Sequence, residues 1–426
     1  MAAAELDLWL GDELVARTSS QRDGKVRITY TDEVAEKYEG GTALLSCSLP
    51  TPGRGEPAKA FAFLEGLLPE GRALQAAAAT VRGVKLREGT LTLDSPTDAL
   101  LLLSAYGREC AGAVIAVPSG SGAPHLGRYE SVDGTRLGEI IRDLPHRPLG
   151  ADLDREIRLS LAGAQPKFLL ARFDGQWFEP VDGAASTHIL KPSIDWESSA
   201  ENEALVLNLA RAVGLTASES WVEHYGKQSI LATSRYDREV EGRTVRRVHQ
   251  EDMCQALGMR TGDKYAIGRP SERMARVLRN WADDPTTETG RLFRQIAFRC
   301  AVGDEDGHGK NYSLLLDDGR VRLAPLYDSL CTLIYPELTR RMAAQIGNQV
   351  SLDKVDRAAL LAEAKAMGIP QGVAEHALSE LTADLRQALG ALDNAFLAGW
   401  DSGQVLDTIT SRLDRLDSGN PLGGTD

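Results

Sequence analysis

The chain lacks the features that mark membrane, secreted and zinc-binding proteins. No apolar run approaches the roughly 18 to 20 residues that a membrane helix needs, so we expect no membrane association. The first residues, MAAAELDLWLGDE, lack the basic start and apolar centre of a signal peptide. The five cysteines are scattered without a C-x-x-C pair, and the seven histidines form no H-E-x-x-H motif. We therefore expect a cytoplasmic protein with reduced thiols and without a zinc site.

Positive charge is also in short supply. Lys and Arg number 48 against 61 Asp and Glu, which gives a net charge of −13 at pH 7. A surface of this sign repels the phosphates of nucleic acids, so we expect DNA to be bound only with the help of a partner. The remaining composition, 42% hydrophobic and 26% charged over 426 residues, is typical of a globular protein with two or three domains.

Residues 1–150 are predicted to form a small α+β unit. Apolar residues alternate over Leu6–Leu10 and Val26–Tyr30, which favours strands. Three segments have the apolar spacing of helices: 61–68, 72–80 and 98–105. The Ser-, Gly- and Pro-rich segment Pro118–Pro124 is predicted to be a linker or a long surface loop.

Residues 151–248 show an order of elements that indicates a kinase-like nucleotide-binding lobe. In chain order these are a small-residue run at 160–165, strands at 167–173 and 176–179, a strand at 187–191, a helix at 201–213 and strands at 220–224 and 229–233. Asp174-Gly175 supplies the first hairpin turn. The third strand ends in Lys191, and Glu203 extends the inward-facing stripe of the helix, where a carboxylate needs a partner such as Lys191.

Residues 249–417 are predicted to form an all-helical C-terminal lobe, and 418–426 a disordered tail. A helix over Arg291–Val302 leads into the segment that begins at Asp306, and Val355–Leu416 has the periodicity of two or three amphipathic helices. The predicted fold class is therefore α+β, a two-lobed protein-kinase-like fold with an additional N-terminal α/β subdomain.

Asp306-Gly-His-Gly-Lys-Asn311, followed by Asp328, has the layout of a kinase catalytic loop. Phosphoryl transfer spreads negative charge over the γ-phosphoryl oxygens, so the reaction needs Mg²⁺ and groups that hold it. Asn311 and Asp328 offer the oxygen ligands that Mg²⁺ prefers, and Asp306 can orient a hydroxyl and accept its proton. The alternative is an Asx-capped loop between a helix and a strand.

Other candidate residues each have a structural alternative. Lys191 fits phosphate binding or an exposed strand end, and the Ser160–Gln165 run fits a phosphate cradle or a tight turn, since it matches neither G-x-G-x-x-G nor a Walker A loop. Tyr236 and Asp237 fall where a hinge would meet adenine and ribose, or form a surface turn. His308 is either a site residue or a structural one.

Six motifs together resemble the HipA family, the serine/threonine kinase toxins of bacterial toxin–antitoxin systems. They are Ser160-Leu-Ala-Gly-Ala-Gln-Pro-Lys167, Thr187-His-Ile-Leu-Lys-Pro192, Arg235-Tyr-Asp-Arg238, His249-Gln-Glu-Asp-Met-Cys-Gln255, the Asp306–Asn311 loop and Tyr327-Asp328. The resemblance spans nearly the whole chain, because Leu67-Leu-Pro-Glu-Gly71 and the strand-rich start are similar to the family's N-terminal subdomain.

The resemblance implies an ATP- and Mg²⁺-dependent protein kinase. Its implied site comprises Asp306 as catalytic base, Asn311 and Asp328 on the metal, and as nucleotide contacts Ala162, Gly163, Ala164, Gln165, Lys191, Glu203, Ser234, Tyr236, Asp237, His308 and Lys310. Ser160 matches a serine whose autophosphorylation ejects the phosphate loop and silences the kinase. The implied partners are a HipB-like helix-turn-helix antitoxin, operator DNA through that antitoxin, and a protein substrate of the aminoacyl-tRNA synthetase class, whose phosphorylation halts translation and promotes persistence.

Two further functions stay open at this point. A small-molecule kinase of the aminoglycoside phosphotransferase type shares the Asp-x4-Asn loop, and a nucleotide-bound corepressor would act with its antitoxin without turnover. The chain departs from the protein-kinase template, since Leu-Tyr-Asp328 replaces Asp-Phe-Gly and no H-R-D precedes the loop.

Overall fold

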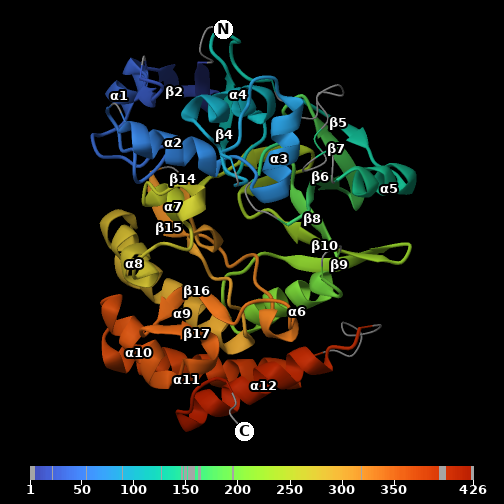
Figure 1. Ribbon diagram of the computed structural model, residues 1–426, viewed down its shortest axis with the longest axis vertical. Helices are drawn as coiled ribbons and strands as arrows, with labels where there is room; N and C mark the ends of the chain where they lie inside the picture. Colours follow the sequence, from blue (N-terminus) through green and yellow to red (C-terminus); the bar gives the residue numbers. More distant parts are fainter. Residues whose placement is uncertain are drawn as a thin grey trace. The chain divides into compact units, whose positions relative to one another are not determined.

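The computed structural model divides the chain into two compact units (Figure 1). The first unit comprises Met1–Pro192, Tyr225–Asp263 and Leu314–Val321, and the second comprises Ser193–His224, Lys264–Ser313 and Arg322–Asp426. The structure describes residues 5–423 apart from 22, 54, 89, 126, 145–146, 148–150, 152–158, 162–164, 194–195, 318 and 393–399. Domain boundaries at 150 and 248 stay a prediction, since each unit gathers segments from both sides of them.

The first unit begins with a four-stranded antiparallel sheet in the order β3-β2-β1-β4. Its strands are β1 Leu6–Leu10, β2 Glu13–Ser20, β3 Val26–Tyr30 and β4 Val114–Pro118. Leu8 lies opposite Ala16 on one side and Ala116 on the other, so its side chain is fully buried. The strands expected at Leu6–Leu10 and Val26–Tyr30 are confirmed.

Four helices accompany this sheet: α1 Asp32–Lys37, α2 Pro57–Gly66, α3 Gly71–Thr80 and α4 Pro96–Tyr106. Figure 1 shows α2 and α4 beside the strands, and the two helices share one apolar core with β1 and β3. Helix α4 begins at Pro96, two residues before the expected segment 98–105. The Ser95 hydroxyl accepts from the Asp98 N–H and the Asp98 carboxylate accepts from the Ser95 N–H, which completes a capping box.

In the larger sheet, the strands that belong to the first unit lie in the order β5-β7-β6-β8-β10, each hydrogen-bonded to the next. These strands are β5 Arg128–Ser131, β6 Phe168–Phe173, β7 Gln176–Val181, β8 His188–Pro192 and β10 Gln228–Ser234, and α5 Gly134–Asp143 packs on the same apolar cluster. Asp174 and Gly175 both have positive φ, 50° and 80°, which a two-residue type I′ turn requires. Lys191 lies opposite Leu231 in the β8–β10 pair.

The first unit ends with shorter elements. The strands β11 Arg238–Glu241 and β12 Thr244–Arg247 form a hairpin, and β13 His249–Asp252 neighbours β14 Ser313–Asp317. Helix α7 Met253–Ala256 and the 3-10 turn η1 Thr261–Asp263 follow β13. Two buried contacts anchor this segment, since Glu251 accepts from the Cys47 N–H at 2.7 Å, and Gln255 Nε2 donates to the Phe63 carbonyl at 3.0 Å.

A buried ion network joins residues that follow α4 to residues that follow β10. Both Glu109 oxygens are engaged, because Arg235 Nη1 and Arg238 Nη2 lie 3.0 and 2.9 Å from Oε1 while Arg247 Nη2 lies 2.7 Å from Oε2. Burial alone would raise the pKa of Glu109, but the three guanidinium groups lower it to about 2. Asp237 supplies a second carboxylate to Arg235, at 2.8 Å.

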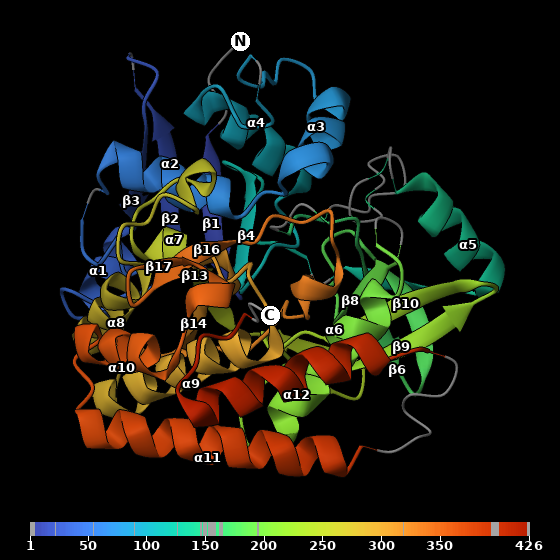
Figure 2. The same cartoon turned by 60° about the horizontal axis from the view of Figure 1, so that its bottom comes forward.

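The second unit is mainly helical. Its helices are α6 Ser199–Ala212, α8 Pro270–Trp281, α9 Pro285–Val302, α10 Arg357–Ala366, α11 Gln371–Gly390 and α12 Gly403–Ser418. Figure 2 shows α11 and α12 side by side, and both contact α9. The described residues of 355–416 therefore form three helices, the upper of the two numbers that the periodicity of this segment favours.

The expectation of an all-helical C-terminal lobe needs a correction. Short strands occur in that part of the chain: β13, β14, β15 Arg320–Leu323, β16 Arg341–Ile346 and β17 Gln349–Ser351, with 3-10 turns η2 Gly309–Asn311, η3 Thr332–Ile334 and η4 Leu352–Lys354. Strand β9 Ser220–Tyr225 follows α6, as expected. Runs of three to six residues are too short to stand out from helical periodicity in a sequence.

The expected disordered tail is also wrong over its described part. Leu422 is buried, and its N–H donates to the Val355 carbonyl at 2.7 Å while the Gly423 N–H donates to the Asp353 carbonyl at 2.8 Å. Residues 424–426 lie outside the described residues. All five cysteines are buried free thiols, and none of the described helices combines the length and apolar character needed to cross a bilayer.

Replacing Glu109 should destabilise the protein strongly. Glu109→Gln keeps the side-chain shape but removes the charge that the buried Arg235 and Arg238 share with Arg247, and an uncompensated buried charge costs about 3–5 kcal/mol. Chemical denaturation would measure the free energy of unfolding. Glu239→Ala is the matched control, since it removes a 2.7 Å ion pair with Arg246 at the surface and should change stability by less than about 1 kcal/mol. Equal effects of the two substitutions would contradict a structural role for the network.

Candidate active site

The loop from Asp304 to Asn311 begins where α9 ends. The Asp284 side chain caps the start of α9, Pro285 occupies its first turn, and Gly303 ends it in the left-handed conformation with φ 81°. The loop then folds on itself, because the His308 N–H donates to the Asp306 carbonyl at 2.7 Å and the Asn311 N–H donates to the His308 carbonyl at 2.9 Å. The end of helix α9 and these backbone hydrogen bonds together give the loop one compact conformation.

The backbone of Asp306 is fixed from both sides. Its N–H donates to Asp304 Oδ1 at 3.0 Å, and its carbonyl accepts from Asn311 Nδ2 at 2.9 Å. The second contact also orients the Asn311 amide, because turning Nδ2 toward Asp306 directs Oδ1, the atom that binds metals, elsewhere. The structure thus places the expected base and one expected metal ligand in the same loop.

Arg299, on the last turns of α9, holds the rest of this arrangement together. Its guanidinium is buried and forms an ion pair with Asp304. It also donates to three backbone carbonyls, those of Tyr327 at 2.7 Å, Asp328 at 3.1 Å and Asn311 at 3.4 Å. One side chain therefore joins the Asp306–Asn311 loop to the segment that carries Asp328.

The Asp328 backbone adopts a conformation that non-glycine residues rarely take, with φ 52°. Hydrogen bonds on both sides hold it there, since Ser329 Oγ donates to Asp304 Oδ2 at 2.7 Å and Tyr327 Oη donates to the Lys310 carbonyl at 2.6 Å. Such a conformation persists only where its surroundings determine it, and it is frequent at functional sites. The fold thus fixes the direction in which the Asp328 carboxylate leaves the chain.

Asn311 and Asp328 suit a hard divalent cation. Mg²⁺ is commonly bound by one or two such oxygen ligands of the protein together with waters and substrate phosphates. Asp306 is exposed as a residue, but the atoms packed around its carboxylate limit its hydration, and together with the nearby charges of Asp304 and Asp328 they raise the pKa of Asp306 to about 7. A cation would relieve this crowding of negative charge. In the part of the chain that the structure describes, no group of three or more His, Cys, Asp or Glu is placed to hold a metal. With Asn311 and Asp328 as its two protein ligands, a cation here would complete its shell with phosphate and water.

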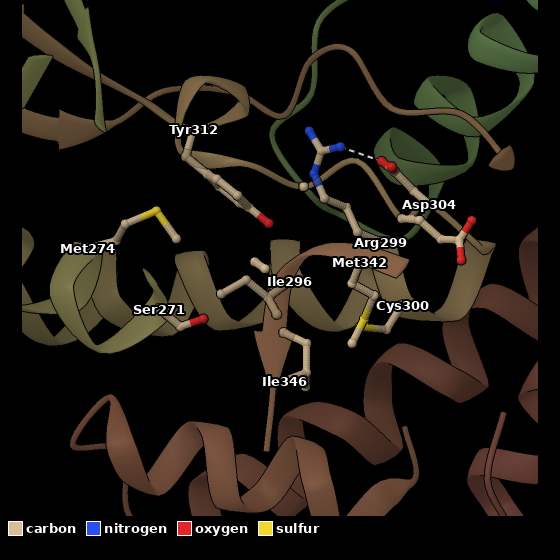
Figure 3. A pocket seen from close by; sticks show the side chains of 12 residues that line it. Ser271, Met274, Ile296, Arg299, Cys300, Asp304, Tyr312, Met342 and Ile346 are labelled. Carbon is tan, nitrogen blue, oxygen red and sulfur yellow. Dashed lines mark hydrogen bonds and ion pairs between the residues drawn. The ribbon is translucent and has the colours of Figure 1, made fainter. Parts of the chain in front are cut away.

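A small cavity lies beneath this loop (Figure 3). It encloses about 20 Å³, room for about one water molecule, and apolar side chains such as Met274, Ile296 and Ile346 line it together with the Arg299–Asp304 pair. A nucleotide does not fit in this space. The cavity belongs to the packing that supports the loop.

His308 and Lys310 are both buried within the loop. The ring of His308 meets the edge of Tyr265, with ring centroids 5.2 Å apart and planes at 71°. The Tyr265 hydroxyl in turn donates to Asp306 Oδ1 at 3.3 Å. Sequence reasoning missed Tyr265, which lies 41 residues before Asp306 and in no recognised motif.

The remaining candidates lie elsewhere in the fold. Lys191 is buried in β8 of the first unit, and Glu203 is buried on α6 of the second, so their pairing stays a prediction. Ser234 ends β10 with its Oγ 3.3 Å from His188 Nε2, and the Tyr236 hydroxyl bonds to the Gln250 side chain. Gln165 is half-buried, and Ala162, Gly163 and Ala164 lie outside the described residues.

Asp237 has a different position from the one expected. Its carboxylate is buried and accepts from Arg235 Nε at 2.9 Å, from Arg235 Nη2 at 2.8 Å and from the Gly112 N–H at 2.7 Å. Burial opposes its ionisation, but Arg235 and Arg238 hold the pKa of Asp237 well below its usual range. Both carboxylate oxygens of Asp237 serve this ion network, and a ribose contact by Asp237 stays a prediction.

Ser160 is fully buried. Its hydroxyl donates to the Leu67 carbonyl at 2.6 Å, and its N–H donates to the Glu109 carbonyl at 2.7 Å. A hydroxyl in this position is shielded from any phosphoryl donor. The structure therefore shows Ser160 in a conformation that it must leave before it can react.

Arg299→Lys should loosen the loop while the protein stays folded. Lysine keeps the charge near Asp304 but lacks the planar fork that reaches several carbonyls, so we expect a loss of about 1–3 kcal/mol and faster amide hydrogen exchange over residues 304–311. Arg279→Lys is the control, because Arg279 also donates to a carbonyl, that of Met367 at 2.6 Å. Unchanged exchange in the loop would show that Arg299 does not hold it.

Comparisons with known proteins agree with this architecture. A HipA N-terminal domain family model matches residues 6–117, and a HipA-like C-terminal domain model matches residues 159–389. The chain is 35% identical over 402 residues to Y4mE of Sinorhizobium fredii, covering 91% of this chain and 92% of that protein. It is 25% identical over 400 residues to the serine/threonine-protein kinase toxin HipA of Shewanella oneidensis, covering 90% and 88%.

A solved structure shows the same fold. The HipA chain in a Shewanella oneidensis MR-1 complex of HipA, HipB and operator DNA superimposes with a TM-score of 0.79 at 24% identity, covering 97% of this chain and 98% of that one. The α+β, kinase-like fold class expected from the sequence is thereby confirmed. With both family domains matched in order and a 35% identical relative aligned over nearly its full length, the chain belongs to the HipA family.

Proposed function

We propose that this chain is an ATP- and Mg²⁺-dependent serine/threonine protein kinase that serves as the toxin of a toxin–antitoxin pair. The observation that carries the proposal is the geometry around Arg299, which ties the backbone of Asn311 to that of Asp328 while Asp304 and Asn311 fix the backbone of Asp306. Membership in the HipA family, with a relative named as a serine/threonine-protein kinase toxin, supports the same activity.

The residues divide the chemistry among them. Asp306 would align the acceptor hydroxyl and take its proton as the new oxygen–phosphorus bond forms and the bond between the γ-phosphorus and the leaving ADP breaks. Asn311 Oδ1 and the Asp328 carboxylate would hold Mg²⁺, while Lys191 would neutralise phosphate charge. When bound, Mg·ATP supplies the phosphoryl group and the positive charge that stabilises its transfer. Catalysis then rests on positioning and electrostatics, because the protein forms no covalent bond itself.

The substrate and partner follow from the family. We propose that the acceptor is a serine or threonine of a translation protein of the aminoacyl-tRNA synthetase class, so that activity arrests growth and promotes persistence. A HipB-like helix-turn-helix antitoxin would restrain the kinase and carry it to operator DNA. Two observations support this partner: the related HipA occurs in a complex with HipB and operator DNA, and a net charge of −13 leaves DNA contacts to another chain.

Ser160 is proposed to silence the kinase by its own phosphorylation. The buried position leaves space for a hydroxyl that donates to the Leu67 carbonyl. A phosphoserine is larger than serine, carries a charge of about −1.5 to −2 and presents acceptor oxygens to a carbonyl that itself can only accept. The modified residue would therefore not fit this buried position.

Asp306→Ala should abolish phosphate transfer without unfolding the protein. Loss of a catalytic base lowers rates by about 10²–10⁴-fold, and the Asp306 side chain is exposed. The assay is transfer from labelled Mg·ATP to cell-extract proteins, with growth arrest on expression as the second readout. Asp407→Ala, at an exposed acid on α12, is the control.

The same assay separates the competing functions. Label on small metabolites with none on protein would indicate a small-molecule kinase of the aminoglycoside phosphotransferase type. Normal operator binding with the antitoxin but no turnover by the unmodified chain would indicate a corepressor. Transfer that persists in Asp306→Ala would contradict the role given to Asp306.

Ser160→Ala should produce a kinase that stays active for longer. The alanine loses one buried hydrogen bond, worth about 1 kcal/mol, and cannot be phosphorylated. Mass spectrometry of the chain after incubation with Mg·ATP would locate the phosphate, and time courses of transfer would show whether activity decays. A wild-type chain that transfers phosphate to other proteins yet carries none on Ser160 would rule out this mode of silencing.

A further inference from the structure

The fixed backbone of Asp306 leaves its side chain undetermined. Asp304 and Asn311 hold the N–H and the carbonyl, but rotation about the two side-chain bonds still moves both carboxylate oxygens. A catalytic base must present one oxygen to the acceptor hydroxyl within hydrogen-bond distance. Backbone contacts alone therefore do not complete the site.

The Tyr265 hydroxyl reaches this carboxylate. It donates to Oδ1 at 3.3 Å, a long bond of the kind that catalytic groups often show before substrate binds. An ionised carboxylate accepts hydrogen bonds on both oxygens, so a donor at Oδ1 leaves Oδ2 available. Tyr265 and Asp306 belong to the same compact unit, which also contains the Asn311 and Asp328 segments.

Burial does not explain the position of Tyr265. Tyr265 has 58% of its surface exposed. Among the exposed large hydrophobic residues of the described chain, Val373 has the same exposed fraction and none has a higher one. Two contacts aim the ring instead. Its edge meets His308 from the catalytic loop, and Lys264 Nζ lies 5.2 Å from the ring centroid. The hydrophobic effect therefore contributes little to the position of Tyr265, whose hydroxyl is directed at the Asp306 carboxylate.

We propose that Tyr265 is a positioning residue that holds the Asp306 carboxylate by Oδ1, so that Oδ2 faces the acceptor hydroxyl. The proposal rests on the kinase function given above. Tyr265 transfers no proton and touches no nucleotide; it restricts the rotation of the side chain that does the chemistry. His308, which is buried in the catalytic loop, contacts the Tyr265 ring and thereby helps to position it.

Loss of the hydroxyl has a defined consequence. Without the donor, the carboxylate divides its time among side-chain conformations, and only some of them face the acceptor. The rate of the chemical step falls in proportion, whereas nucleotide binding stays the same, because the lost contact involves only the base. A merely structural role would change the stability of the protein and leave the chemical step alone.

Tyr265→Phe tests this, because it removes one oxygen and keeps the ring with its His308 and Lys264 contacts. The measured quantity is the rate of phosphate transfer from labelled Mg·ATP to the chain itself and to cell-extract proteins, as a function of ATP concentration. We expect a maximal rate about tenfold lower, with an unchanged half-saturating ATP concentration and an unchanged thermal midpoint. Calorimetric titration with a non-hydrolysable Mg·ATP analogue should give the wild-type affinity.

Two further variants sharpen the result. Tyr38→Phe is the matched control, since it removes another phenol that donates to a carboxylate, that of Glu13 at 2.9 Å, and should keep the wild-type rate. Tyr265→Leu removes the ring as well and should lose about as much rate as Tyr265→Phe if the hydroxyl is the active part.

The outcomes separate this proposal from the function on which it rests. If the wild-type chain transfers no phosphate, the kinase function fails, whatever Tyr265 does. If the wild-type chain is active and Tyr265→Phe matches it, the positioning role is wrong. A faster Tyr265→Phe would also overturn the proposal, because it would mean that the phenol obstructs the acceptor instead of aligning the base.

Discussion

Burying the guanidinium of Arg299 obliges the surrounding chain to supply acceptors for its N–H groups. The acceptors are the Asp304 carboxylate and the carbonyls of Asn311, Tyr327 and Asp328. The catalytic loop and the Asp328 segment therefore both adopt conformations that place acceptors around the same buried charge. Because the guanidinium is planar and rigid, it fixes the relative geometry of the groups that it reaches.

The first unit applies the same rule to a carboxylate. Glu109 is buried among three arginines, and Asp237 balances part of their charge. One of these arginines, Arg235, lies within the Ser234–Tyr236 segment and Arg238 follows two residues after it, so the network anchors that segment. Asp237, which the sequence offers as a nucleotide contact, has both carboxylate oxygens in hydrogen bonds of this network.

Local patterns were sufficient for much of the fold. The Asp174-Gly175 turn and the strand that carries Lys191 depend on residues within a few positions of one another, and each lies within one residue of where its pattern predicts. The short strands β15–β17 and the conformation of residues 419–423 could not be predicted from local patterns. Residues 419–423, for example, are held by contacts with residues distant in the sequence, such as the hydrogen bond from Leu422 to Val355.

The sequence by itself determined the HipA resemblance and the identities of Asp306, Asn311 and Asp328, because the chemistry of phosphoryl transfer requires those residue types at that spacing. Only the tertiary structure decided that Arg299 holds them, that Ser160 is buried and that Tyr265 meets Asp306 across 41 residues of chain. The physical reason is burial. Whether a polar group must find a partner depends on its removal from water, and that depends on segments that are distant in sequence.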